Sequence, residues 1–149
     1  MNFTTFRTNL EALEKSIAVT SPTSAQVKRV YWGAVPKAIT DLPAVINALS
    51  ETDRTIGYGL RDQRLRVNVQ MLVAKALAED ERSSLLATAL WFAAKDKFDA
   101  DITIGGSVSL SVLQGADPTV PVILTHAGEA YIGFNAVLEI QDVEEFTFG

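Results

Sequence analysis

The sequence predicts an α+β fold, in which a mostly antiparallel sheet of four to five strands carries two main helices on one face. The first observation is alternation, because apolar residues take every second position in segments 65–73, 108–112 and 132–140. Successive strand side chains point to opposite faces, so each segment is expected to bury one face and expose the other. The second observation is helical spacing of apolar residues in 3–18 and 80–98. One-sided strands with separate helices are typical of antiparallel α+β domains.

Length and composition indicate one domain over residues 1–149, with 48% apolar and 21% charged residues. The chain has no cysteine, which excludes a disulfide framework, a thiolate metal site and a cysteine nucleophile. The net charge of −5 comes without a basic cluster, which argues against binding nucleic acid through its phosphates. No signal-peptide pattern opens the chain and no apolar run approaches a membrane span, so a soluble protein made in the cytoplasm is expected.

The first predicted element is a helix over 3–18, and the polar segment 20–24 ends it as a loop. Segment 27–35 mixes Val, Tyr and Trp with Lys and Arg, and is expected to be a strand or an irregular arm. Residues 44–46 are expected to form a short strand, with Pro43 near its start, where a missing N–H does least harm. The apolar stripe of the first helix comprises Phe3, Phe6, Leu10, Leu13 and Ile17.

Segment 55–62 contains two glycines and is expected either to extend the next strand or to form a mobile hairpin arm. That strand runs to about Val73, with its odd-numbered residues buried. The acidic stretch 79–81 opens the second helix, because carboxylates are favourable in a first turn. The helix is expected to bury Leu85, Leu86, Ala89, Leu90 and Ala93, with Trp91 and Phe92 widening the stripe.

Three strands are predicted in the last third of the chain. In 108–112 the apolar residues Val108, Leu110 and Val112 are expected to face the core, between serines. A second strand covers 120–126, a turn lies at 127–129, and the final strand covers 132–140 with its even-numbered residues buried. The acidic tail 142–149 carries two phenylalanines and is expected to be flexible until a partner orders it.

The sequence predicts no catalytic, cofactor or metal site. His126 is the only histidine, and nothing around it resembles a nucleophile elbow. Asp99 and Asp101 lack the further spaced ligands of a calcium loop. The stretch 57–59, Gly-Tyr-Gly, precedes no predicted helix and is interpreted as a bend rather than a phosphate loop. The carboxylates of 79–81 are explained by helix capping.

Six residues are candidates for a subunit interface. Arg64 and Arg66, with Asn68 and Gln70, line the polar face of the long predicted strand. A solvated face is the default interpretation, and a contact with an acidic neighbour is the alternative, since arginine suits interfaces. Aromatic residues in the weakly patterned segment 31–35 are either core or interface anchors. The interface is expected to use segment 31–35, the arm 55–66 and the acidic tail, and the candidate residues are Tyr31, Trp32, Tyr58, Arg61, Arg64 and Arg66.

The chain resembles the tail-terminator (tail-completion) proteins of long-tailed phages over roughly residues 1–145. The similarity lies in the order of elements: a leading helix, Leu-Pro-Ala-Val-Ile at 42–46, Leu-Arg-Val-Asn-Val at 65–69, the capped helix, and Ala-Tyr-Ile-Gly-Phe at 130–134 with Leu-Glu-Ile at 138–140. The resemblance implies a virion subunit that forms a hexameric ring at the head-proximal end of the tail tube. The ring would end tube polymerisation and dock to the neck.

The same resemblance implies the partners: five further copies, the tail tube protein and a neck protein, with DNA passing through the lumen without specific binding. Free sheet edges and a net negative charge agree with that role. A neck or head-completion protein is the alternative within the same class. A small-ligand-binding or enzymatic domain, using a cleft between helix 80–98 and the sheet, is the alternative of another class.

Overall fold

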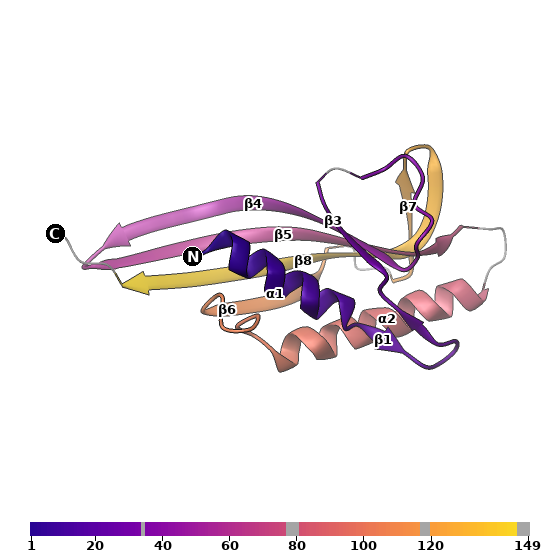
Figure 1. Ribbon diagram of the computed structural model, residues 1–149, viewed down its shortest axis with the longest axis horizontal. Helices are drawn as coiled ribbons and strands as arrows, with labels where there is room; N and C mark the ends of the chain where they lie inside the picture. Colours follow the sequence, from indigo (N-terminus) through magenta and orange to yellow (C-terminus); the bar gives the residue numbers. More distant parts are fainter. Residues whose placement is uncertain (34, 77–80, 117–119, 146–149) are drawn as a thin grey trace.

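The computed structural model describes residues 1–33, 35–76, 81–116 and 120–145. A long twisted sheet carries both helices on one face, and three of its strands extend well past them (Figure 1). The helices are α1 (Phe3–Lys15) and α2 (Glu81–Ala100). The strands are β1 (Ala18–Val19), β2 (Ala25–Gln26), β3 (Arg29–Trp32), β4 (Ala44–Gly57), β5 (Leu60–Lys75), β6 (Leu110–Gly115), β7 (Val122–His126) and β8 (Glu129–Glu145).

The predicted fold class is wrong, because the protein is mostly β, with 48% strand and 24% helix. The main sheet is mixed and has six strands in the order β3-β4-β5-β8-β6, while β7 also pairs with β8; β1 and β2 form a separate ribbon. Segment 29–32 adds a parallel strand to the edge of β4. The strand expected over 44–46 continues to Gly57, because β5 pairs with it along its whole length. Propensity alone did not indicate these long-range pairings.

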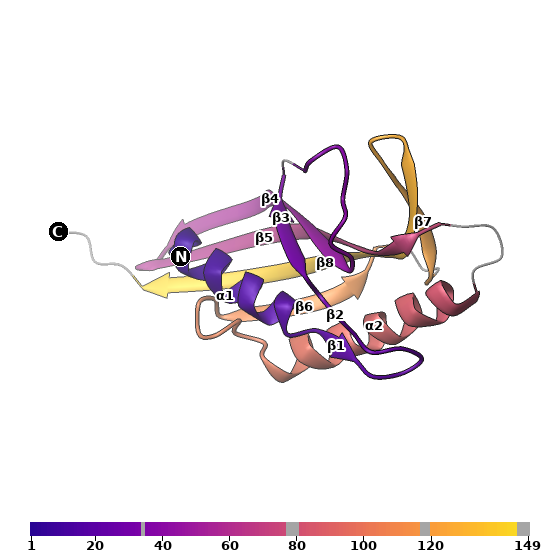
Figure 2. The same cartoon turned by 45° about the vertical axis from the view of Figure 1, so that its right-hand side comes forward.

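Strand β8 is the centre of the sheet. One of its edges pairs with β5 from Tyr131 to Glu145. Its other edge is shared, since residues 129–133 pair with β7 and residues 136–141 pair with β6. The alternations predicted in 65–73 and 132–140 lie in β5 and β8, and the apolar residues of both strands face the main core. The helices cover this face, as the 45° turn of Figure 2 also shows.

In the third alternation Val108 is buried as predicted, but Leu110 and Val112 point the opposite way from the prediction. Ser111 and Leu113 are buried in β6, whereas Leu110 and Val112 are 39% and 40% exposed. The Ser111 hydroxyl donates to the Ile102 carbonyl at 2.9 Å, which satisfies its polar group inside the protein. A satisfied serine therefore takes a core position and places two aliphatic side chains on the outer face.

The apolar stripe of α2 is also rotated from the predicted one. The helix buries Ala87, Leu90, Ala94 and Phe98. Leu85 and Phe92, both predicted to be core residues, are 53% and 64% exposed. Small alanines let the helix approach the sheet closely, and Trp91 packs edge-on against Phe134 with ring centroids 5.1 Å apart. Of the acidic stretch 79–81, only Glu81 lies within the described residues.

A second, smaller core lies on the opposite face of the sheet, at the end nearest β7. It is built from residues of β4, β5, β7 and β8 together with the segment before β4, and its buried members are Ile39, Ala44, Ile46, Leu72, Leu124 and Tyr131. The connection from β3 to β4 and the β7–β8 hairpin stand over this part of the sheet (Figure 2). Beyond them, neither of the two described helices covers this face of the sheet, called here the open face (Figure 1).

The far halves of β4, β5 and β8 form an extension that we call the blade. It comprises residues 48–57, 60–68 and 137–145. β3 covers the outer edge of β4 only as far as Asn47, and every described residue from Ala48 to Tyr58 is exposed. Within the described residues, no strand pairs with this edge from 48 to 57. Segment 55–62 is thus a regular hairpin that extends the long strand.

The C-terminal segment expected as an acidic tail begins inside the blade. Residues 142–145 pair with residues 60–63 of β5, and 146–149 lie outside the described residues. The Met1 ammonium group forms ion pairs with Asp142, at 3.4 Å, and with Glu144. These contacts join the N-terminal end of α1 to the last residues of β8.

On the opposite side of the sheet, which β6 and β7 share, one main-chain acceptor at the edge of β6 is occupied by a side chain. Lys95 of α2 donates from its Nζ to the carbonyl oxygen of Leu113 at 2.7 Å. A lysine side chain held against the edge of a strand hinders the addition of another strand at that point. The two long edges of the sheet are therefore unequal.

Candidate interaction surface

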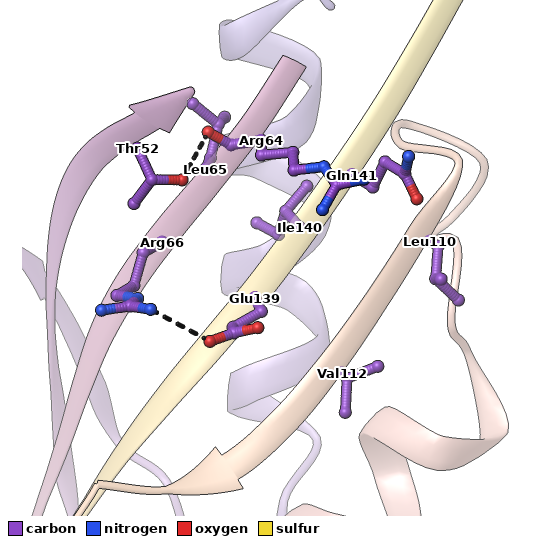
Figure 3. Close-up of a pocket in the computed structure, with 9 residues that line it drawn as sticks. All are labelled: Thr52, Arg64, Leu65, Arg66, Leu110, Val112, Glu139, Ile140 and Gln141. Carbon is purple, nitrogen blue, oxygen red and sulfur yellow. Dashed lines mark hydrogen bonds and ion pairs between the residues drawn. The ribbon is translucent and has the colours of Figure 1, made fainter. Parts of the chain in front are cut away.

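The open face of the blade contains a shallow hollow of about 310 Å³. Strands β4, β5, β6 and β8 all contribute to it, and the side chains lie as Figure 3 shows: Thr52, Arg64, Leu65, Arg66, Leu110, Val112, Glu139, Ile140 and Gln141. Sequence reasoning identified Arg64 and Arg66 in this set. It missed Leu110 and Val112, because it assigned them to the core.

Two arginines define the charge of this hollow. An Arg66 amino nitrogen lies 3.2 Å from the Glu139 carboxylate across the β5–β8 pair. Arg64 approaches Asp62 only to 3.9 Å, and its side chain is 60% exposed. Exposed ion pairs of this kind contribute little to stability, so both guanidinium groups are available to a partner. The aliphatic side chains of Leu110 and Val112 lie beside them and add apolar area.

The hollow combines charged and polar groups with aliphatic side chains. Its lining residues provide two guanidinium groups, one carboxylate, one hydroxyl and one amide among aliphatic side chains. Across the described parts of the chain, no group of three or more His, Cys, Asp or Glu side chains is placed to hold a metal ion. Helix α2, where a cleft was considered, packs directly onto the core through Ala87, Leu90 and Ala94.

Tyr58 stands at the outer end of the blade. It forms the β4–β5 turn with Gly59, with φ angles of 53° and 72°. Positive φ at both central residues is the geometry of a type I′ hairpin turn, which usually takes Asn or Gly at the first position. The Tyr58 side chain is fully exposed, and the neighbouring Ile56 is 57% exposed. A large aromatic side chain in this strained position points to a contact role.

Arg61 lies on the other face of the blade from Arg64. It pairs with Glu144 at 3.4 Å, on the side that also holds the Met1 ammonium group. The structure therefore brings Arg64 and Arg66 together but separates Arg61 from them. Alternation along β5 explains the separation, because odd and even residues face opposite sides.

Tyr31 and Trp32 lie in β3, away from the blade. Tyr31 packs against the second core. Trp32 packs against the main core, makes an edge-on contact with Phe3 at 5.7 Å, and lies under the Arg7 guanidinium at 5.8 Å. Both rings hold neighbouring elements in place, so the structure supports their core interpretation.

Sequence reasoning missed one buried titratable residue, Glu14 on α1. Its side chain is fully buried, and its Oε1 accepts a hydrogen bond of 2.6 Å from Asn47 Nδ2. Burial raises the pKa of the Glu14 carboxyl from 4.5 to about 8, against the lowering effect of the Asn47 hydrogen bond. Glu14 Oε2 and Asn47 Oδ1 are buried without a partner. A protonated Glu14 carboxyl is neutral in this buried position and adds an O–H donor next to the Asn47 amide.

A scan against protein-family models and a search of curated proteins give no match to this chain. In the part of the chain that the structure describes, neither helix has the length and apolar character needed to cross a membrane.

Proposed function

We propose that this chain is a virion structural protein without enzymatic activity, which assembles into a ring, of six copies in the related family, at the head-proximal end of a phage tail tube. The observation that carries the proposal is the blade. It projects beyond the helices, leaves one edge of β4 free over residues 48–57, and exposes Ile56 and Tyr58 at its end. Exposed apolar and arginine side chains on a rigid sheet are typical of a protein interface.

The resemblance of the sequence to tail terminators supplies the rest of the proposal. The ring would end tube growth, present its other side to a neck protein, and let DNA pass through its lumen. The net charge of −5 is consistent with such a conduit, because like charge opposes binding to phosphates.

The state of assembly tests this function directly. We expect the purified protein to have the mass of six subunits by native mass spectrometry, and to show a ring with a central hole by negative-stain electron microscopy. Added to purified tail tubes, it should appear at one end only. A stable monomer at micromolar concentration, with no density at tube ends, would contradict the proposal.

Charge reversal on the blade is expected to weaken the ring. Arg64→Glu removes an exposed guanidinium from the open face and places a carboxylate beside Glu139 and Asp62. We expect at least about tenfold weaker assembly, roughly 1.4 kcal/mol, with an unchanged circular-dichroism spectrum. Arg61→Glu is expected to act in the same direction, with an added loss of the Glu144 ion pair. Concentration-dependent light scattering measures both effects, and unchanged masses would reject these residues as contacts.

A further inference from the structure

Two exposed apolar surfaces remain unexplained by the fold of one copy. The first, called here the tip patch, comprises Arg54, Ile56 and Tyr58 at the end of the blade. The second, called here the α2 stripe, comprises Leu85, Phe92 and Asp96. Ile56, Tyr58, Leu85 and Phe92 are each more than half exposed. The blade ends at one extreme of the long axis, and α2 begins toward the other (Figure 1).

The α2 stripe is a single surface. Residues 85, 92 and 96 lie within a narrow arc of a helix with 3.6 residues per turn. Ala87, Leu90, Ala94 and Phe98 face the sheet on the other side of the helix, so the stripe points outward. It is apolar over its first two turns and ends on a carboxylate.

In the tip patch the charged residue comes first along the chain and the apolar residues follow, which is the reverse of the order in the α2 stripe. Arg54 and Ile56 share one face of β4, and Tyr58 follows in the turn. Arg54 and Asp96 are both exposed, and neither side chain forms an ion pair with another described residue. Tyrosine and arginine are the side chains most often found at the energetic centre of interfaces. Each surface thus has a free charge of opposite sign next to exposed apolar groups.

The spacing of the two surfaces also agrees. Residues 54 and 56 lie about 7 Å apart along a strand, and Tyr58 lies in the turn just beyond the end of β4. Along a helix, residues 96 and 92 lie about 6 Å apart, and 92 and 85 about 10 Å. Arg54 can therefore face Asp96 while Ile56 meets Phe92 and Tyr58 reaches toward Leu85.

We propose that the tip patch of one copy packs on the α2 stripe of the next copy. The two surfaces differ and lie at different places on the molecule, so the contact is head-to-tail, and a head-to-tail contact whose rotation closes produces a ring. This inference rests on the proposed ring and assigns its subunit contact. A second copy is the occupant because this chain itself carries the matching charge and apolar groups.

The test is a charge exchange between two variants. Arg54→Asp places a carboxylate opposite Asp96, and Asp96→Arg places a guanidinium opposite Arg54. Each variant alone is expected to assemble at least tenfold more weakly than the wild type. An equimolar mixture of the two should recover the ring, because each interface then joins a carboxylate to a guanidinium. The double variant Arg54→Asp/Asp96→Arg should assemble alone.

Phe92→Ser and Tyr58→Ser are expected to lose assembly without recovery on mixing. Lys28→Asp makes the same charge change at an exposed position outside both surfaces and should leave the mass unchanged. Circular dichroism and a thermal melt confirm that each variant folds, and native mass spectrometry reads the assembly. If every variant still forms rings as stable as those of the wild type, this contact is wrong. It is also wrong if the mixture of Arg54→Asp and Asp96→Arg forms no rings. A wild-type monomer would overturn the ring itself.

Discussion

Replacing Gly133 with alanine is expected to unfold most of the protein. A Cβ at this position would overlap the carbonyl oxygen of Met71, a main-chain atom of the neighbouring strand. Gly133 pairs with Leu72 of β5 on one edge and Val122 of β7 on the other. Because strands occupy both edges of β8, neither neighbour can withdraw without loss of pairing. The expected destabilisation exceeds about 4 kcal/mol, a large share of the stability of a domain this size.

Gly57→Ala provides the matched control for this prediction. Gly57 also lies in a strand, but a Cβ there meets no heavy atom within 4 Å, and its φ is not in the left-handed region. Its free energy of unfolding should stay within about 1 kcal/mol of the wild type. Urea titrations followed by circular dichroism measure both variants. Equal stability of Gly133→Ala and the wild type would show that β5 and β8 are not held as closely as described.

Glu14→Gln is expected to make the protein more stable at neutral and alkaline pH. The Glu14 pKa is about 8 in the folded protein and about 4.5 when the chain is unfolded. The native state therefore holds a proton that the unfolded state releases. The stabilisation from this group is complete below pH 4.5, falls between pH 4.5 and 8, and is lost above pH 8. The slope is about 1.4 kcal/mol per pH unit.

Glutamine keeps the shape of the acid and offers a permanent donor next to the Asn47 amide, so this pH dependence should disappear. The stability difference between Glu14→Gln and the wild type should be small at pH 4 and reach on the order of 3 kcal/mol at pH 7. Paired urea titrations at pH 4, 5.5, 7 and 8.5 measure it. The control is Glu129→Gln, which makes the same substitution at an exposed position. A stability difference for Glu14→Gln that is the same at all four pH values would refute a buried neutral acid.

The sequence correctly predicts the strands that have one buried face and one exposed face. In β5, Leu65 to Val73 alternate because one face lies under the helices, and this pattern is local. The distal half of β4 has no such pattern. Residues 50–55 are polar on both faces, since neither face is covered, and this part of β4 is held by pairing with β5. Backbone pairing leaves little trace in side-chain order, so the strand was expected to end at 46.

Two other differences between the predicted and the observed structure arise where a buried polar side chain has a hydrogen-bond partner. Ser111 is a core residue because the Ile102 carbonyl accepts its proton. Glu14 is buried because Asn47, distant in sequence, donates to it. Neither partner can be identified from spacing. On the candidate surface, Arg64, Arg66 and Tyr58 could be identified as polar or aromatic residues on a predicted strand or bend. Leu110 and Val112 could not be identified, because alternation alone does not tell which face of a strand is buried.

The unequal edges of the sheet have a consequence for solubility at high concentration. Growth of a fibril by strand addition requires two open edges on every copy, one to receive and one to offer. Here Lys95 occupies a main-chain acceptor at the β6 edge, whereas among the described strands the β4 edge is free over residues 48–57. Strand addition is therefore favoured at β4 and hindered at β6, so pairing through β4 joins two copies more readily than it extends a row of them. The protein thereby keeps one long free strand edge with a lowered tendency toward amyloid-like polymerisation.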